Sequence, residues 1–261
     1  MSLSVPPLRR TAGPTCADRS PPAPSGVPDH PPSARLRALP VSKLVLFLVL
    51  NLWVAGPYYA LQHWVFFAVT PMPETAVDRL IPFSEGAAWL YLSLFLWVPV
   101  PPLLTVSRGD LSRYACGIAG IGLISNLIFL FFPTSAPRPV GATGDAAYGL
   151  VLAADTPMNA CPSLHASLAV FTALWSERLW RHRAQAWGWR MAVWTWTLAV
   201  LYATLATKQH VLVDLVAGSM LATAVYAVLC MRGQRHPPAL PWRAASGGTG
   251  FSANGPHQHG F

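Results

Sequence analysis

Residues 112–132 read SRYACGIAGIGLISNLIFLFF. This mainly apolar run has the length, roughly 20 residues, that a helix needs to cross the hydrocarbon core of a membrane. Five further segments approach this length, at 44–62, 86–106, 164–180, 190–207 and 210–230. The chain is 53% hydrophobic and only 11% charged, whereas about 25% charged residues is usual for a soluble domain. We therefore expect an all-α, polytopic membrane protein with a bundle of six transmembrane helices.

Two polar tails flank the apolar segments. The N-terminal tail is rich in proline and has almost no apolar periodicity, so it buries too little surface to offset the entropy of ordering. We expect a disordered cytoplasmic tail at 1–42, a six-helix membrane domain at 43–231 and a disordered C-terminal tail at 232–261. The four cysteines have no spacing typical of a zinc site, a redox motif or a disulfide framework, and we assign them no chemistry.

The distribution of Lys and Arg predicts the orientation. These residues gather in the N-terminal flank, in the second and fourth connections between segments and in the C-terminal tail, and they are scarce in the other connections. The positive-inside rule then puts both termini in the cytoplasm, and we expect a bacterial inner membrane. The net charge of +8 belongs to the inner loops, so we expect no nucleic-acid partner.

In this orientation the first, third and fifth connections between segments face outward, and they and the segment ends next to them carry all the candidate site residues on one face. We expect the first of them, which contains Asp78, to be a solvated connector. The connection at 133–162 is long enough to fold over a site as a lid, or it is a plain linker.

His210 and Asp214 stand at the start of the sixth segment. They are four residues apart, so on a helix they share one face. The aspartate can accept a hydrogen bond from one ring nitrogen, which leaves the lone pair of the other nitrogen free to attack phosphorus. The alternative is a structural His–Asp pair at a helix end.

The fourth segment begins with Pro162-Ser163-Leu164-His165. Ser163 is a natural N-cap residue, and the free amides of a helix start form an anion site. His165 at the edge of such a site could protonate a departing alkoxide as a general acid. The alternative for Ser163 is ordinary helix capping.

Two outward-facing cations, Arg138 and Lys208, could stabilise the charge that develops on a phosphoryl group. The alternative for each is snorkelling at the membrane interface. A nucleophile, an orienting carboxylate, an acid and two cations on one face together favour phosphoryl transfer, for which we expect no metal and no cofactor.

At these residues the sequence resembles the type 2 phosphatidic acid phosphatase superfamily, also called the lipid phosphate phosphatase and haloperoxidase superfamily, over roughly residues 44–230. Three elements of the family are Lys-x6-Arg-Pro, Pro-Ser-Gly-His and Ser-Arg-x5-His-x3-Asp. They resemble, in turn, Arg138-Pro139, the stretch 162–165, and His210 with Asp214. The resemblance implies a six-helix bundle and a metal-independent mechanism in which His210 is the nucleophile, Asp214 its partner and His165 the acid.

The chain also departs from the family pattern. Phe131 replaces the Lys of the first element, Leu164 the Gly of the second, and Ala203 with Thr204 the Ser-Arg of the third. The motifs Thr207-Lys208-Gln209-His210 and Ile81-Pro82-Phe83 resemble the branch of the superfamily that includes inositol phosphorylceramide synthases. In that branch the Arg of the third element is lost, and we expect Lys208 to take over part of its role.

These observations predict an integral-membrane lipid phosphatase that hydrolyses a phosphate ester of a lipid in the bilayer. One alternative is a lipid phosphotransferase that moves a phospho-head-group to a lipid alcohol. The other is a non-catalytic transporter or scaffold, in which the His and Asp side chains serve proton relay or packing. A transporter of this kind predicts an internal repeat, and the sequence shows none.

Overall fold

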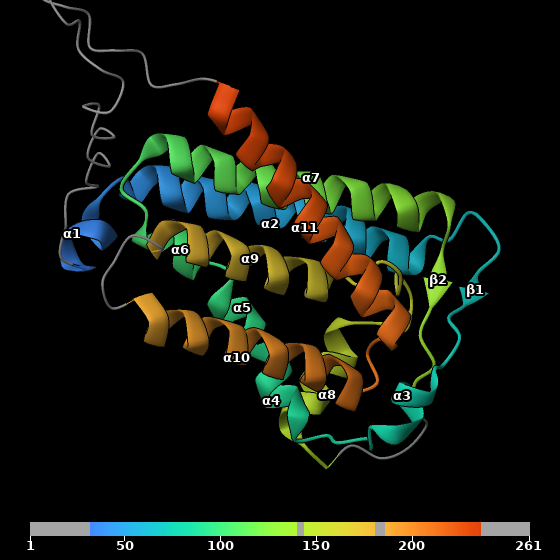
Figure 1. Ribbon diagram of the computed structural model, residues 1–261. Coiled ribbons are helices and arrows are strands. Elements are labelled where there is room, and N and C mark those ends of the chain that lie inside the picture. The colour runs from blue at the N-terminus through green and yellow to red at the C-terminus, as the bar shows by residue number, and fades with distance from the viewer. Residues whose placement is uncertain (1–31, 140–143, 181–185, 236–261) are drawn as a thin grey trace, which may run out of the picture.

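The computed structural model describes residues 32–139, 144–180 and 186–235 (Figure 1). The described chain is mostly helical, and its helices are α1 (Pro32–Arg37), α2 (Pro40–His63), α3 (Ala76–Leu80), α4 (Ala87–Leu92), α5 (Leu94–Trp97), α6 (Val100–Leu104), α7 (Arg108–Phe131), α8 (Ala146–Ala154), α9 (Leu164–Trp180), α10 (Ala186–Ala206) and α11 (Leu212–Arg235). Two short strands, β1 (Thr70–Pro71) and β2 (Thr134–Ser135), pair in parallel. Most of both predicted tails lies outside the described residues, and α1 falls within the predicted N-terminal tail.

Helices coincide with all six apolar segments predicted from the sequence. In the described ranges, four stretches are long and apolar enough to cross a membrane, namely Pro40–His63, Ala87–Leu104, Arg108–Phe131 and Leu212–Met231. The helix α9 has only 17 residues, and α10 is not among the four. The chain is therefore a mostly helical membrane protein with four candidate spans, and the count of six stays a prediction.

The second predicted span, 86–106, is not one continuous helix. It divides into α4, α5 and α6, with breaks at Ser93 and before Val100. The hydroxyl of Ser93 donates to the carbonyl of Leu90, and the prolines at 99, 101 and 102 have no amide hydrogen for the helical ladder. The segment therefore crosses the fold as a stepped chain of short helices.

The core lies between α2, α7, α9 and α11 and contains large aromatic side chains, among them Phe129, Phe171 and Trp175. α2 packs along α7, while α9 contacts α7, α10 and α11. In Figure 1, α2 and α7 lie side by side, α11 crosses the bundle obliquely, and α10 lies beside α9 with α4 next to it. A Cβ on Gly122 would lie 2.6 Å from the side chain of Val54, so a glycine is needed where α7 meets α2.

The connections gather at the two ends of the bundle. One end holds α1, α6 and the start of α7, and the opposite end holds β1, β2, α3 and α8 (Figure 1). The chain enters both α9 and α11 from the second end, which we call the site end. All the site residues predicted from the sequence lie there.

Candidate active site

His165 and His210 face each other at the site end. His165 lies in the first turn of α9, and His210 lies just before the start of α11. Nδ1 of His165 is 3.4 Å from Nε2 of His210, and both side chains are buried. Oδ2 of Asp214, in the first turn of α11, lies 3.6 Å from Nδ1 of His210. The structure therefore brings together the three residues that the sequence singled out as catalytic.

Tyr91 of α4 adds a fourth residue, which the sequence analysis missed. Its hydroxyl lies 2.6 Å from Nε2 of His165, and the two ring centroids are 4.8 Å apart. A tyrosine in an apolar helix is usually a core residue whose hydroxyl finds a partner, so no sequence pattern indicates that this partner is the candidate acid. We call Tyr91, His165, His210 and Asp214 the histidine cluster.

The geometry favours one arrangement of protons in the histidine cluster. The carboxylate of Asp214 favours the tautomer of His210 that carries its proton on Nδ1, which leaves a lone pair on Nε2. Nδ1 of His165 is then the donor to that lone pair, and Nε2 of His165 accepts from the hydroxyl of Tyr91. The nitrogen of His210 that has the lone pair therefore faces His165.

Close packing of α11 on the start of α9 holds the two histidines in place. The amide of Ser163 donates to the carbonyl of Asp214 at 3.0 Å. The hydroxyl of Ser167 lies 2.9 Å from the carbonyl oxygens of both Ser163 and Gly218. A Cβ at position 218 would lie 2.3 Å from the carbonyl oxygen of Ser163. Only glycine at this position lets the two helices approach closely enough to bring His165 and His210 together.

Ser163 caps α9, in agreement with its expected N-cap preference. Its hydroxyl oxygen accepts from the amide of Ala166 at 3.2 Å, and the residue is fully buried. Its own amide is already engaged by Asp214. A contact between Ser163 and phosphate would therefore have to use the hydroxyl hydrogen, and this role stays a prediction.

Arg138 is held by a carboxylate. Its Nη1 donates to the carbonyl of Asp155 at 2.6 Å, and its Nη2 donates to Oδ2 of Asp155 at 3.2 Å and to the carbonyl of Thr156 at 2.7 Å. Oδ1 of Asp155 accepts from the hydroxyl of Tyr58 at 2.8 Å and from Nε2 of Gln62 at 2.6 Å. We call Arg138, Asp155, Tyr58 and Gln62 the arginine cluster. No motif or helical spacing marks Asp155 in the sequence, so we did not predict it as a site residue.

Lys208 anchors a neighbouring loop. Its Nζ donates to the carbonyls of Asp78 at 2.6 Å and Ile81 at 2.8 Å, and its φ of 53° lies in the left-handed region. Oδ1 of Asp78 accepts from the amide of Leu212 at 2.8 Å, and Asp78 is buried. The expectation of a solvated connector is therefore wrong at Asp78, because this part of the first connection supports the loop that carries His210. The role of Lys208 on a phosphate stays a prediction.

Cys161 lies next to the histidine cluster. Burial, together with the carboxylate of Asp214, raises the pKa of the Cys161 thiol to about 11. The thiol is therefore protonated and weakly nucleophilic near neutral pH. In the part of the chain that the structure describes, no group of three or more His, Cys, Asp or Glu residues is placed to hold a metal ion.

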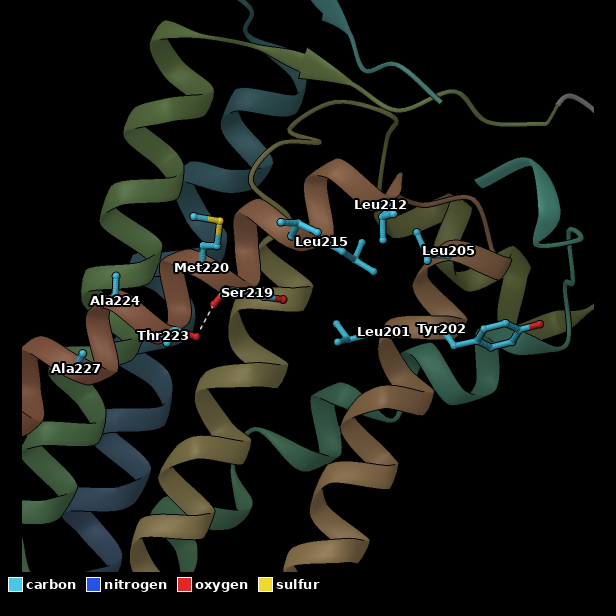
Figure 2. A pocket seen from close by; sticks show the side chains of 11 residues that line it. Leu201, Tyr202, Leu205, Leu212, Leu215, Ser219, Met220, Thr223, Ala224 and Ala227 are labelled. Carbon is cyan, nitrogen blue, oxygen red and sulfur yellow. Dashed lines mark hydrogen bonds between the residues drawn. The ribbon is translucent and has the colours of Figure 1, made fainter. Parts of the chain in front are cut away.

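Two apolar hollows lie along the helices. The first, which we call the α2 groove, has a volume of about 540 Å³, runs along α2, and is bordered by Tyr91, Asp155 and His165 at the site end. The second, the α10–α11 cleft, has a volume of about 780 Å³. Figure 2 shows leucine side chains of α10 and α11 around this cleft and the hydrogen bond that the hydroxyl of Thr223 donates to the carbonyl of Ser219. Of these two hollows in the described chain, the α2 groove is the one that includes members of the histidine and arginine clusters among its lining residues.

Residues 58–228 match the family model of the PAP2 superfamily. The match covers more than half of the 261-residue chain and includes both clusters. Comparisons with curated proteins and with solved structures found no match. The narrower resemblance to inositol phosphorylceramide synthases stays a prediction. The extent of the family match shows that this chain belongs to the PAP2 superfamily.

Proposed function

We propose that this chain is an integral-membrane lipid phosphatase that hydrolyses a phosphate ester of a lipid through a phosphohistidine at His210. The observation that carries the proposal is the line of contacts from Tyr91 through His165 and His210 to Asp214. Membership of the PAP2 superfamily, whose members are typically phosphoesterases or phosphotransferases, supports the same class of reaction.

In the first step, Nε2 of His210 attacks phosphorus, and the bond from phosphorus to the ester oxygen breaks. Asp214 stabilises the positive charge that forms on the His210 ring. His165 gives a proton from Nδ1 to the departing oxygen, so it must enter this step as an imidazolium, with Nε2–H donating to the oxygen of Tyr91. An anionic phosphate next to the ring stabilises that charged form.

In the second step, a water molecule attacks the phosphorus of the phosphohistidine. His165, now neutral, takes a proton from this water, the bond from nitrogen to phosphorus breaks, and inorganic phosphate leaves. A phosphorus atom does not fit between nitrogen atoms that are 3.4 Å apart. Substrate binding must therefore separate the two rings, and the phosphoryl group then replaces their mutual hydrogen bond.

Arg138 is the cation best placed to stabilise the phosphoryl oxygens. Its partner Asp155 borders the same groove as His165. The Nε atom of Arg138 is buried without a hydrogen-bond partner in the described chain. A phosphate would bind this guanidinium by competing with Asp155. Ser163 and Lys208 complete the proposed phosphate-binding set, although their present contacts are with other groups of the protein.

The proposal includes a topology. Six helices would cross the membrane, with α9 and α10 as the two short or less apolar spans, both termini in the cytoplasm and the site at the outer face of a bacterial inner membrane. The reaction would need no metal, because a histidine nucleophile and a histidine acid supply the nucleophile and the proton. The positions of Lys and Arg support this orientation.

A lipid phosphotransferase is the second candidate, and Asp155 is the observation that favours it. A carboxylate next to the phosphoryl site repels a phosphate but accepts hydrogen bonds from the hydroxyls of an alcohol acceptor. Such an acceptor would attack the same phosphohistidine in place of water.

The test is phosphate release by detergent-purified protein in the presence of a chelator, with the His210→Ala variant as the blank. The substrates are phosphatidic acid, phosphatidylglycerol phosphate, an isoprenyl pyrophosphate and a phosphosphingolipid. We expect release by the wild type alone. A new lipid product that forms only when a lipid alcohol is added would support the transferase, and inactivity in both assays would contradict both enzymatic proposals.

A further inference from the structure

The α2 groove spans most of the depth of the bundle. The residues of α2 that border it recur at helical spacing on one face, from Pro40 to Tyr59. These 19 steps correspond to about 28 Å of helix at about 1.5 Å per residue, which is close to the roughly 30 Å of a bilayer's hydrocarbon core. The groove is therefore long enough to hold an extended hydrocarbon chain.

The two ends of the groove differ from its middle. The site end is polar and includes His165 and Asp155, whereas the middle is lined by aliphatic and aromatic side chains such as Leu50, Val54 and Ile118. Lys43 lines the opposite end, where its Nζ donates to the carbonyls of Arg35 at 2.8 Å and Leu103 at 2.6 Å. The amine of Lys43 is thus engaged by the protein itself, whereas the site end holds the histidine cluster. A catalytic polar end and a long apolar middle match a lipid with one phosphate head.

The groove is open towards the surroundings of the bundle. Leu44 and Phe47, both on its wall, are 60% and 50% exposed. Its opposite wall comes from the stepped segment α4–α6 and includes Pro99 and Pro102. Among the described residues, α2 packs on α7 and makes at most weak contacts with α4–α6. A lipid could therefore enter between α2 and α4–α6 without leaving the bilayer.

The family match does not account for this groove. The matched residues begin at Tyr58, whereas most of the wall that α2 contributes lies at positions 40–55. The groove therefore joins a catalytic end that the family shares to a long wall outside the matched residues.

We propose that the α2 groove binds one hydrocarbon chain of the lipid phosphate, with the phosphate ester at His165 and the chain extended along α2 towards Lys43. This inference rests on the proposed function and adds a substrate class: a phosphate ester with one long hydrocarbon chain, either alkyl or isoprenoid. Bilayer lipid is as apolar as the groove, so the groove contributes position rather than a hydrophobic driving force. A chain held along α2 fixes where its phosphate stands relative to His210.

The first experiment narrows the groove at its middle. Leu50→Trp places a larger side chain in the groove, and Leu52→Trp is the matched control, because Leu52 is on the same helix, is 76% exposed and does not border the groove. The substrates are monoalkyl phosphates of increasing length and, in a second arm, isoprenyl monophosphates. Leu50 is eight residues from Tyr58, so only chains longer than about 12 Å should reach it.

We expect the kcat/KM of Leu50→Trp to fall about tenfold for chains longer than this limit and to change less than about twofold for shorter ones. Leu52→Trp should follow the wild type at every length. A long-chain loss in one arm only would identify the chain as alkyl or isoprenoid. Equal losses at all lengths, or the same profile in both variants, would overturn the inference.

The second experiment measures binding without turnover, so it does not depend on the proposed reaction or on the folding of a variant. Wild-type protein is photolysed with a long alkyl phosphonate that carries a diazirine at its chain end, and the labelled residues are mapped. We expect labels on groove residues near Lys43 and Phe47. Phosphate release is read from the lipid phosphates of the assay described above, not from the phosphonate. Labels in the groove without such release would keep this inference and reject the phosphatase, whereas release together with labels spread over the outer face of α2 would reject the inference alone. The absence of groove labels together with the absence of phosphate release would reject the inference and the phosphatase.

Discussion

The histidine cluster and the arginine cluster lie at the same end of the molecule but use their polar atoms differently. In the histidine cluster, Nδ1 of His210 and Oδ1 of Asp214 are buried without a hydrogen-bond partner in the described chain. In the arginine cluster, both oxygens of Asp155 and both Nη atoms of Arg138 have partners, and Nε of Arg138 lacks one in the described chain. The first cluster therefore keeps unused polar capacity, whereas the second satisfies most of its own.

This difference suggests different roles for the two clusters. Groups of the histidine cluster can change partners and protonation during a reaction at little cost, because few fixed contacts are lost. The guanidinium of Arg138 is already paired, so a phosphate must compete with Asp155 for it. We expect substitutions in the histidine cluster to act on the chemical step, and substitutions in the arginine cluster to act on phosphate binding and on stability.

The largest effect should come from His210→Ala. Removal of the proposed nucleophile should lower kcat by about a thousandfold or more, with little change in the thermal unfolding midpoint. His63→Ala is the control, because it makes the same substitution at an exposed position outside both clusters. Substantial turnover by His210→Ala, measured as phosphate release, would remove the main distinction between the two clusters.

Arg138→Gln should lower kcat/KM by about a hundredfold, mainly through a higher KM, because a cation for the phosphoryl oxygens is lost. It also leaves the Asp155 carboxylate buried and unpaired, which should cost about 3–5 kcal/mol of unfolding free energy. Adding Asp155→Asn removes that charge, so the double variant should regain stability but not activity. If the double variant regained both stability in denaturation assays and activity in kinetic assays, Arg138 would be a structural residue.

Tyr91→Phe should have a smaller effect, with kcat lowered about tenfold, because His165 loses the hydrogen bond that orients its ring but keeps its proton-transfer chemistry. The acid and base limbs of the pH–rate profile should also move, since the hydroxyl that contacts Nε2 of His165 is gone. Tyr202→Phe, at a half-exposed tyrosine bordering the α10–α11 cleft, is the matched control. An unchanged pH profile would limit Tyr91 to packing.

Lys208→Met should have the smallest effect on catalysis, with kcat/KM lowered about threefold, because Nζ is held by two carbonyls and reaches a phosphate only by giving up these contacts. The loss of these hydrogen bonds should lower the free energy of unfolding by about 2 kcal/mol. Chemical denaturation measures the second quantity. An unchanged kcat/KM at lowered stability would remove Lys208 from the proposed phosphate-binding set.

The sequence predicted the helices better than their continuity. Apolar runs determine where helices form because hydropathy is a local property, and helices coincide with all six predicted segments. The steps between α4, α5 and α6 also have a local cause in the prolines at 99, 101 and 102. The predicted span at 86–106 rested on length and hydropathy, by which Ala87–Leu104 is long and apolar enough to cross a membrane, but these two properties do not reveal the breaks in its helix.

The candidate site was predictable only in part. His210 and Asp214 are one helical turn apart, so their spacing alone places them together. The contact between Tyr91 and His165 joins residues 74 positions apart, and it depends on how α4 is rotated against α9. The pairing of Asp155 with Arg138 depends on how the connection at 133–162 folds. Such contacts arise from tertiary packing, which no single-sequence pattern encodes.

The most direct test of the central claim is to detect the phosphorylated residue. The wild type and the His165→Asn variant would be mixed with a ³²P-labelled lipid phosphate that has a good leaving group, quenched in base and digested for peptide mapping. We predict a base-stable, acid-labile phosphate on His210 in both proteins, because an activated leaving group does not need the acid but the intermediate always needs the nucleophile. Turnover with no such label, or a label on any other residue, would contradict it.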